Sequence, residues 1–259
     1  MNNPITLQAA TEKAGTARIR DLDTSALSKQ DVLNLILQRS EIIQDQPAPN
    51  SYIKAWTRGE AGPLLQLIDE IGQDELIRRA AAFILLEYET LEPTLAAQPP
   101  SAATDIGCGY AIFDLFLAQD FDCKLTLIDL EENDERHFGF DQTGAAYSNL
   151  EIAKAFLRAN GIAARRIKTI NPEKQSLVRI KNQDLVVSLI SCGFHYPWTT
   201  YESFFRKAVK PGGRIILDLR QRTLKRTRDE ISALGAFEEL STGASGKAPR
   251  VMVTRQGTD

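Results

Sequence analysis

Apolar and polar residues follow two different rhythms along this chain, and the change between them falls near residue 100. Before that point, apolar residues recur at the three-to-four-residue repeat of amphipathic helices. After it, short apolar runs alternate with helical patterns, as in strands that are connected by helices. The QPPS stretch at 98–101 lies at the change and favours an irregular joint. We therefore expect a helical region over residues 1–98 and an α/β region over residues 99–259.

Helices are the only regular elements that the first hundred residues predict. Residues 1–24 are polar and rich in small side chains, so we expect a loose arm there. Ser28 followed by Asp31 is a helix-capping pattern, and apolar residues at helical spacing come directly after it. Pro63 is placed to open another helix, and a dense apolar run within 74–91 predicts a longer one.

The second region predicts a doubly wound, mostly parallel sheet. Several of the expected strands are almost entirely apolar, as a sheet that is covered by helices on both faces requires. We expect strands at 102–106, 125–130, 167–170, 184–190, 214–219 and 250–254. We expect helices at 112–118, 149–160, about 200–209 and 228–234. A further strand at 238–241 and the turn at 242–247 predict an antiparallel hairpin that closes one edge of the sheet.

Composition and charge exclude several classes of protein. The 259 residues are 43% hydrophobic and carry a net charge of −3, which gives no general attraction for nucleic acid or anionic membranes. Cys108, Cys123 and Cys192 have no CxxC spacing, so neither a disulfide framework nor a zinc site is expected. Neither a secretory leader nor an apolar run of about 18 residues occurs, so we expect a cytoplasmic protein without a membrane-spanning helix.

One turn carries the clearest chemical signal in the sequence. Asp105, Gly107, Cys108 and Gly109 follow the first expected strand, and a helical pattern begins directly after them. Strand, glycine turn and helix in this order form the nucleotide-binding crevice of an open α/β sheet. Glycine allows the backbone to approach a ligand where a Cβ atom would collide with it.

Residues near this turn favour a sulfonium cofactor over a dinucleotide. The dinucleotide fingerprint has a third glycine where this chain has Ile112, whose branched side chain would obstruct close packing of helix on strand. Asp105 would repel a pyrophosphate and attract a cation. Asp129, which ends the second expected strand, can accept hydrogen bonds from the ribose of either cofactor. S-adenosylmethionine therefore fits better than a nicotinamide dinucleotide, and a nicotinamide oxidoreductase is the less favoured alternative.

The stretches DIGCGYA, LIDLE, DLVVSLIS and VKPGGRIILDLR, in this order over roughly residues 101–255, resemble class I S-adenosylmethionine-dependent methyltransferases. The resemblance implies a seven-stranded Rossmann-like α/β sheet, with S-adenosylmethionine as cofactor and S-adenosylhomocysteine as product. It also implies that the glycines line the methionine end of the cofactor and that Asp129 binds the ribose. Cofactor contacts are expected from Asp105, Gly107, Cys108, Gly109, Asp129, Leu130 and Ser191.

Two positions depart from the family pattern. Ala111 stands where the family has its third glycine, and its small side chain should be tolerated. The loop after the third strand, which usually meets the adenine, reads NPEK at 171–174. These departures keep another alternative open, in which the chain is a non-catalytic S-adenosylmethionine-binding partner subunit.

The loop at 191–201 follows the fourth expected strand and should face the same crevice. His195 lies in this loop, and a neutral histidine can remove a proton from a hydroxyl while a methyl group is transferred to it. We predict His195 and Tyr196 as catalytic residues, and Trp198 and Tyr201 as substrate contacts. The alternative is that the aromatic side chains only pack and that His195 hydrogen-bonds the backbone.

A connection of about 18 residues follows the second strand, where loops in such folds are much shorter. It contains His137 and Phe138, which we predict as substrate contacts in a lid over the crevice. The alternative is a solvated acidic insertion. Asp134, His137 and Asp218 could form a metal site, but they lack a fixed ligand spacing, so no metal is predicted.

Two further groups could reach the acceptor. A basic run follows the fifth strand and could either meet a phosphate or form a solvated helix start. It consists of Arg220, Arg222, Lys225, Arg226 and Arg228. Tyr52, Trp56 and Arg58 in the N-terminal region could line the acceptor pocket or pack between helices.

The run SCGFHYPWTTY, together with HFGFDQTGAAYSNLEIAKAFLRANGI, resembles uncharacterised bacterial methyltransferases that accompany surface-polysaccharide genes. This weaker resemblance favours O-methylation of a small molecule, such as a sugar hydroxyl. RNA methylation is the alternative, and the acidic net charge and the lack of a recognisable RNA-binding module count against it. The polar arm and the helical region are compatible with a homodimer.

Overall fold

The computed structural model describes residues 5–130, 148–242 and 248–257, and its centre is a seven-stranded sheet in the order β3-β2-β1-β4-β5-β7-β6. Neighbouring strands from β3 to β5 are parallel, whereas β7 is antiparallel to both β5 and β6. The strands are β1 (Ala102–Ile106), β2 (Lys124–Ile128), β3 (Ile167–Ile170), β4 (Gln183–Ser188), β5 (Val209–Asp218), β6 (Gly235–Thr242) and β7 (Pro249–Arg255). The predicted fold class is confirmed, and so is the antiparallel hairpin.

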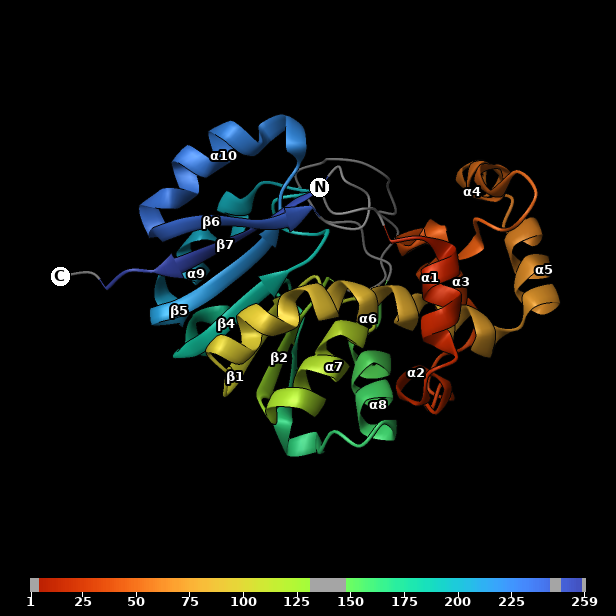
Figure 1. The fold of residues 1–259 in the computed structure, drawn as a ribbon, viewed down its shortest axis with the longest axis horizontal. Coiled ribbons are helices and arrows are strands. Elements are labelled where there is room, and N and C mark those ends of the chain that lie inside the picture. The colour runs from red at the N-terminus through yellow and green to blue at the C-terminus, as the bar shows by residue number, and fades with distance from the viewer. Residues whose placement is uncertain (1–4, 131–147, 243–247, 258–259) are drawn as a thin grey trace.

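Helices cover both faces of the sheet (Figure 1). One face carries α6 (Gln73–Ala97), α7 (Ile112–Phe121) and α8 (Leu150–Ala159), and the other carries α9 (Glu202–Ala208) and α10 (Leu224–Ile231). In β4, Leu185 packs with the first group and Val186 with the second, which is the two-residue repeat of a strand. This double coverage explains why the strands read as nearly continuous apolar runs.

Short 3₁₀ helices occupy several of the connections. They are η1 (Ser40–Ile43), η2 (Ala164–Arg166), η3 (Leu177–Arg179), η4 (Trp198–Tyr201), η5 (Gln221–Thr223) and η6 (Ser232–Leu234). Between β3 and β4, η3 is the only helical element, so no α-helix crosses from one of these strands to the next.

The N-terminal region is helical, as predicted, but its first described residues are not a loose arm. Its helices are α1 (Leu7–Ala14), α2 (Ala17–Arg20), α3 (Lys29–Gln38), α4 (Pro49–Thr57) and α5 (Gly62–Ile71). Thr6 caps α1 by accepting a hydrogen bond from the N–H of Ala9 at 3.1 Å. Ala10 and Ile19 are fully buried, and both α1 and α2 pack on α6. The predicted arm is therefore wrong, because a few apolar side chains suffice to hold these short helices on a neighbour.

The capping box predicted at Ser28 is confirmed, but the helix behind it ends sooner than its apolar pattern. The Ser28 hydroxyl accepts from the N–H of Asp31, and the Asp31 carboxylate accepts from the N–H of Ser28 at 2.8 Å. α3 ends at Gln38 because Arg39 leaves helical geometry, with φ −137° and ψ 70°. The apolar pattern continues in η1. This break brings Arg39 to the functional site described below.

Two elements extend beyond their predicted ends because side chains hold them. α6 continues to Ala97, where the Arg214 guanidinium of β5 donates to the carbonyl of Thr94 at 2.5 Å. β5 begins at Val209, before the strand predicted at 214–219, and so includes the KPGG stretch at 210–213. Lys210 of this stretch forms an ion pair with Asp184 at the start of β4, which anchors the early part of the strand.

The N-terminal helices and the sheet share one hydrophobic core. Buried residues from Ala10 in α1 to Ile216 in β5 form a contiguous cluster that includes side chains of α3, α5 and α6. In Figure 1, α4 and α5 lie at the end of the molecule farthest from β6 and β7. Within the described ranges, no helix has both the length and the apolar character that crossing a bilayer requires.

Candidate functional site

A cavity of about 380 Å³ lies where α3, η1 and α6 meet the carboxyl ends of β1, β2 and β4. It brings together every predicted cofactor residue and most of the predicted substrate-side residues that the structure describes. The predicted residues that line it are Asp105, Gly107, Cys108, Gly109, Asp129, Leu130, Ser191, His195, Tyr196 and Tyr201. Ends of neighbouring parallel strands meet at one edge of a sheet, which is why such distant positions converge.

The glycine turn after β1 has no room for larger residues. Gly107 has φ +77°, and a Cβ atom there would lie 2.0 Å from Oγ and 2.5 Å from Cβ of Ser191. Gly109 has φ +56°, and its Cβ would lie 3.1 Å from Oε1 of Gln38. Ala111, at the family's third glycine, adopts the same left-handed region with φ +58°. The turn is therefore a tight cradle between the loop after β4 and the end of α3.

The N–H groups of this turn are already used within the protein. Gly107 and Cys108 donate to the carbonyl of Ile128, at 2.7 Å and 3.4 Å, and Gly109 donates to Oδ2 of Asp129 at 2.8 Å. These bonds fix the turn to the end of β2. They also leave no N–H of these three residues for a pyrophosphate, which dinucleotide sites bind through such groups.

Two carboxyl groups, those of Asp105 and Asp114, lie together beneath the turn. Burial raises the pKa of both, that of Asp114 to about 7, and the Asp114 and Asp129 carboxyls raise the pKa of Asp105 further. Because the two carboxyls interact, the pair holds a proton more readily than an isolated carboxyl would. Oδ1 of Asp105 is buried without a hydrogen-bond partner among the described residues, and Asp105 lines the cavity. The negative charge expected at Asp105 therefore develops only when this proton leaves.

The loop after β4 carries the predicted catalytic residues. The backbone N–H of His195 donates to the carbonyl of Ser191 at 2.8 Å, and the half-buried His195 side chain lines the cavity. The Tyr196 hydroxyl lies 3.2 Å from Oγ of Ser191. Burial raises the pKa of Tyr196 well above its usual value, so its phenol can donate a hydrogen bond but is a poor base. Arg220 braces the loop by donating to the carbonyl of Phe194 and stacking on its ring at 5.0 Å.

Several predicted contacts are not brought to the cavity. Trp198 is buried in the core beneath α9 and α10, and its indole N–H donates to Glu230 at 3.1 Å, so it lines neither of the two cavities described here. Tyr52, Trp56 and Arg58 belong to α4 and its end and line neither cavity. The basic run after β5 is also absent from both linings. His137 and Phe138 lie outside the described residues.

The two cysteines near the crevice are not nucleophiles. Burial raises the pKa of both Cys108 and Cys192, so their thiols stay protonated at neutral pH. Across the described ranges, no group of three or more His, Cys, Asp or Glu side chains is placed to hold a metal ion. Asp218, considered above for a metal site, is instead bound to an arginine.

The N-terminal region contributes a wall of the cavity that the sequence did not predict. Its lining residues are Leu35, Leu37, Gln38, Arg39, Glu41, Ile84 and Glu87. Glu87 directly follows the apolar stretch AAAFILL of α6, and this position was a usable signal, because a charge among buried residues seldom lacks a partner. Gln38 and Arg39 gave no such signal, since their position depends on where α3 ends.

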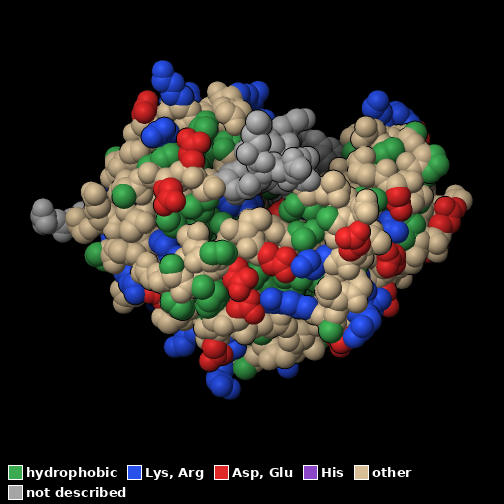
Figure 2. Space-filling model, viewed as in Figure 1, with side chains coloured by type: hydrophobic (Ala, Val, Ile, Leu, Met, Phe, Trp, Pro, Cys, Tyr) green, Lys and Arg blue, Asp and Glu red, His purple; other side chains and the backbone are tan. Residues whose placement is uncertain are grey.

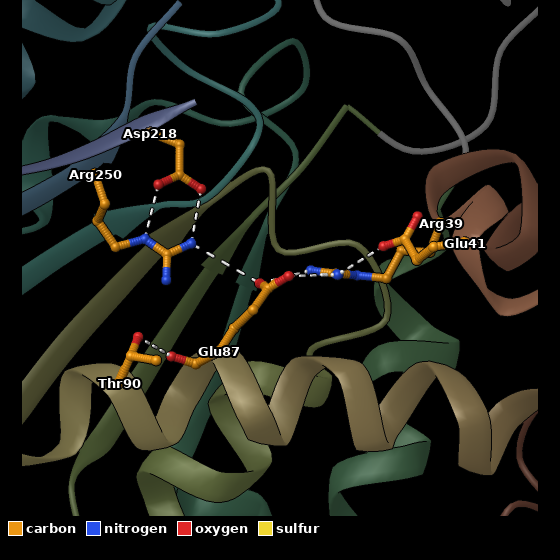
Figure 3. Close-up of polar contacts among 6 residues, drawn as sticks. All are labelled: Arg39, Glu41, Glu87, Thr90, Asp218 and Arg250. Atoms are coloured by element: carbon orange, nitrogen blue, oxygen red, sulfur yellow. Dashed lines mark hydrogen bonds and ion pairs between the residues drawn. The ribbon is translucent and has the colours of Figure 1, made fainter. Parts of the chain in front are cut away.

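A chain of buried charges stands behind this wall (Figure 3). The Arg250 guanidinium of β7 donates to both oxygens of Asp218, at 2.7 Å and 2.8 Å, and lies 3.8 Å from Glu87. Glu87 accepts two hydrogen bonds from Arg39, at 2.8 Å and 3.0 Å, and Arg39 also donates to Glu41 at 3.2 Å. Burial opposes ionisation of Glu87, yet Arg39 and Arg250 outweigh it and lower its pKa. The chain links the end of β5, β7, α6 and η1.

A second cavity of about 430 Å³ adjoins the first. It shares Leu130, Tyr196 and Tyr201 with the first cavity and is otherwise lined mainly by the 172–181 connection and α9. Pro172, from the loop that the family resemblance assigns to the adenine, lies in its wall.

The strand order, the glycine turn after β1 and the acidic residue after β2 together define the Rossmann-like fold of class I methyltransferases. No protein-family model and no curated protein matches the sequence of the chain. Solved structures do match its fold. A candidate O-methyltransferase from Nostoc punctiforme aligns with a TM-score of 0.51 and 13% identity, over 70% of this chain. The alignment covers only 59% of the Nostoc chain.

Two more distant structures carry related names. A candidate S-adenosylmethionine-dependent methyltransferase from Methanococcus maripaludis aligns with a TM-score of 0.48 and 15% identity, over 75% of this chain and 93% of its own. A methyltransferase from Thiobacillus denitrificans, solved with S-adenosylhomocysteine, aligns with a TM-score of 0.38 and 20% identity, over 51% of this chain and 47% of its own. At these identities the likeness concerns the fold alone.

Proposed function

We propose that this chain binds S-adenosylmethionine and transfers its methyl group to a hydroxyl of a small molecule. The observation that carries the proposal is the chemistry of the glycine turn. The N–H groups of Gly107, Cys108 and Gly109 are bonded to Ile128 and Asp129 and are not offered to a pyrophosphate. Asp105 lines the cavity with an unpartnered buried oxygen, Oδ1, and would attract a cation. A cofactor that brings an ammonium and a sulfonium instead of phosphates fits this donor and acceptor set.

The residues around the turn fit the parts of this cofactor. Gly107, Gly109 and Ser191 would line the methionine end, and the two glycines allow Ser191 and Gln38 to pack close to the turn. Asp129, which lines the cavity next to Leu130, would accept hydrogen bonds from the ribose. When bound, S-adenosylmethionine supplies an electrophilic methyl group. The protein then has to align an acceptor with that methyl group and exclude water.

We assign acceptor activation to His195. Its side chain lines the cavity, and hydrogen bonds from the loop backbone hold its position. As a neutral imidazole it can take the hydroxyl proton while the oxygen attacks the methyl group. Tyr196 and Tyr201 supply aromatic walls, and the Tyr196 phenol can orient the acceptor as a donor. A sugar or a similar polyol suits such walls, in line with the weaker resemblance noted in the sequence.

Two measurements test this function. Calorimetric titration should detect S-adenosylhomocysteine binding and no NAD binding. A methyl-transfer screen with labelled S-adenosylmethionine over sugars, nucleotide sugars and small phenols should then identify the acceptor. Preference for NAD would overturn the proposal. Tight S-adenosylhomocysteine binding without transfer to any acceptor would favour the non-catalytic partner subunit.

His195→Ala should lower turnover by about 100-fold or more, because general-base catalysis contributes on this order. The affinity for S-adenosylhomocysteine should stay near that of the wild type. Thr199→Ala is the matched control, since Thr199 is an exposed residue of the same loop that lines neither cavity. Equal turnover in the two variants would remove His195 from the mechanism.

The affinity for S-adenosylhomocysteine should rise as pH increases through about 7, the pKa to which burial raises Asp114. The Asp105–Asp114 pair, beside Asp129 and Cys108, holds a proton near neutral pH, and an ammonium bound at Asp105 would displace it. Binding that releases a proton is favoured as pH rises. Calorimetry in two buffers with different heats of ionisation counts the protons that are released.

Asp114→Asn gives the control for this pH dependence. It removes the neighbouring acid, so Asp105 should ionise at lower pH and the affinity should change less across the same range. Wild-type binding without net proton release would contradict the role given to the pair.

RNA methylation has less support than a small acceptor. On the face shown in Figure 2, acidic and basic side chains of the described residues are interspersed and form no single basic patch. The basic run after β5 does not line either cavity. A homodimer stays a prediction, and gel filtration with light scattering would test it.

A further inference from the structure

The cavity wall made by the N-terminal region lies directly over the glycine turn. Oε1 of Gln38 approaches the position of a Gly109 Cβ to 3.1 Å. The next residue, Arg39, lines the same cavity and has a side chain that is 16% exposed. Of the described residues that line the cavity, Arg39 is the only lysine or arginine. A cation is thus held at the end of the crevice where the methionine part of the cofactor would lie.

The Arg39 guanidinium is only partly used within the protein. Both of its Nη groups donate to Glu87, and Nη1 also donates to Glu41. Its Nε makes no hydrogen bond to the described residues and is not among the polar atoms sealed in the interior. Nε and Nη2 form one edge of the planar guanidinium, and such an edge matches the two oxygens of a carboxylate.

The buried charge chain holds this edge in place. Glu87 binds the adjoining Nη1–Nη2 end of the Arg39 guanidinium through two hydrogen bonds, and Arg250, which pairs with Asp218, lies beside Glu87. Figure 3 shows the side chains of Arg250, Glu87 and Arg39 following one another from β7 to η1. A long arginine side chain usually loses conformational freedom when it binds an anion, and here that freedom is already lost. Arg39 is therefore preorganised toward the cavity.

We infer that the Nε–Nη2 edge of Arg39 receives the α-carboxylate of the methionine part of S-adenosylmethionine. The inference rests on the cofactor proposed above and adds the residue that binds its carboxylate. The methionine part of this cofactor carries both an ammonium and a carboxylate. Asp105 offers an acceptor for the ammonium. Glu41, Glu87 and Asp129 would repel the carboxylate unless a cation lay beside it. Arg39 supplies that cation from outside the methyltransferase sheet.

The test compares two ligands that differ only in the carboxylate. S-adenosylhomocysteine has it, and decarboxylated S-adenosylhomocysteine keeps the ammonium but lacks the acid. Arg39→Lys retains a positive charge toward Glu87 but loses the planar edge. We expect calorimetry to show that Arg39→Lys weakens S-adenosylhomocysteine binding by about tenfold or more. Binding of the decarboxylated ligand should change by less than about twofold.

Arg79→Lys is the matched control, because Arg79 also lies in the N-terminal region with a 14% exposed side chain that pairs with Asp45 and Glu75. It should leave both affinities unchanged, and thermal unfolding of each variant reports its folding. Equal weakening of both ligands by Arg39→Lys would make Arg39 a structural residue and overturn the inference. Unchanged S-adenosylhomocysteine affinity would also overturn it. Wild-type protein that binds neither ligand would overturn the proposed function as well.

Discussion

Glu87→Ala should lower the free energy of unfolding by about 3 to 5 kcal/mol, which is the loss seen when one partner of a buried ion pair is removed. The side chain of Glu87 is 4% exposed and lies between Arg39 and Arg250. Without it, the Arg250 guanidinium keeps Asp218, but Arg39 keeps only Glu41. Urea unfolding followed by circular dichroism measures the change.

Glu89→Ala is the control on the same helix. Glu89 is 37% exposed and pairs with Lys13, so its loss should cost less than about 1 kcal/mol. Both variants replace a glutamate of α6 with alanine, so they change helix propensity equally. The difference between their losses of stability therefore measures the contribution of the buried charge chain. Similar losses in both variants would show that the charge chain contributes no more than a surface pair.

The buried charge chain also determines the direction in which stability changes on acidification. The pKa of Glu87 is lowered from 4.5, so its contribution to stability is complete above about that pH. It is lost as pH falls through the folded-state pKa, when the carboxylate takes up a proton. Glu87→Ala should therefore lose less stability than the wild type on acidification, and urea midpoints measured across that range would check this.

Gly107→Ala should weaken S-adenosylhomocysteine binding by on the order of 100-fold or abolish it. The new Cβ would lie 2.5 Å from Cβ of Ser191, and rotation of the Ser191 side chain cannot relieve that contact. The turn or the loop after β4 must move, and both line the cavity. Left-handed backbone at φ +77° adds about 1 to 2 kcal/mol of strain for a residue with a Cβ.

Gly212→Ala controls for that strain. Gly212 has φ +74°, and its Cβ would meet nothing within 4 Å. The variant should lose a similar amount of stability from its backbone alone and keep its affinity for S-adenosylhomocysteine. Thermal unfolding and calorimetry on both proteins make the comparison. Unaltered cofactor affinity in Gly107→Ala would show that the turn does not form part of the cofactor site.

The sheet and the turn were predictable because local pattern determines them. The apolar run of β4 is buried on both faces, and the glycines at 107 and 109 occupy backbone that glycine favours. Asp129 follows from its place at the end of a strand. All of these residues lie at one edge of the sheet, where strand order and spacing place them, so periodicity and spacing were enough.

The wall made by the N-terminal region was not predictable, because it depends on contacts distant in sequence. The sequence offered Tyr52, Trp56 and Arg58 either as pocket residues or as packing between helices. The structure uses Gln38 and Arg39 instead, since α3 ends just before Arg39 and the chain turns toward the sheet. Trp198 was misplaced for a similar reason, because its indole fits the core beneath α10.

The buried charge chain also constrains the order in which the protein can be assembled. Glu87 is made well before Arg250, because α6 precedes the sheet and β7 is its last strand. A growing chain can pair Glu87 with Arg39 early, but Arg250 reaches it only when β7 enters between β5 and β6. Synthesis of β7 thus closes the sheet and balances the charge behind the cavity in one late step. A nascent chain without β7 would carry the turn, the loop and the Arg39–Glu87 pair, but not the Arg250 guanidinium that lies beside Glu87 and neutralises Asp218.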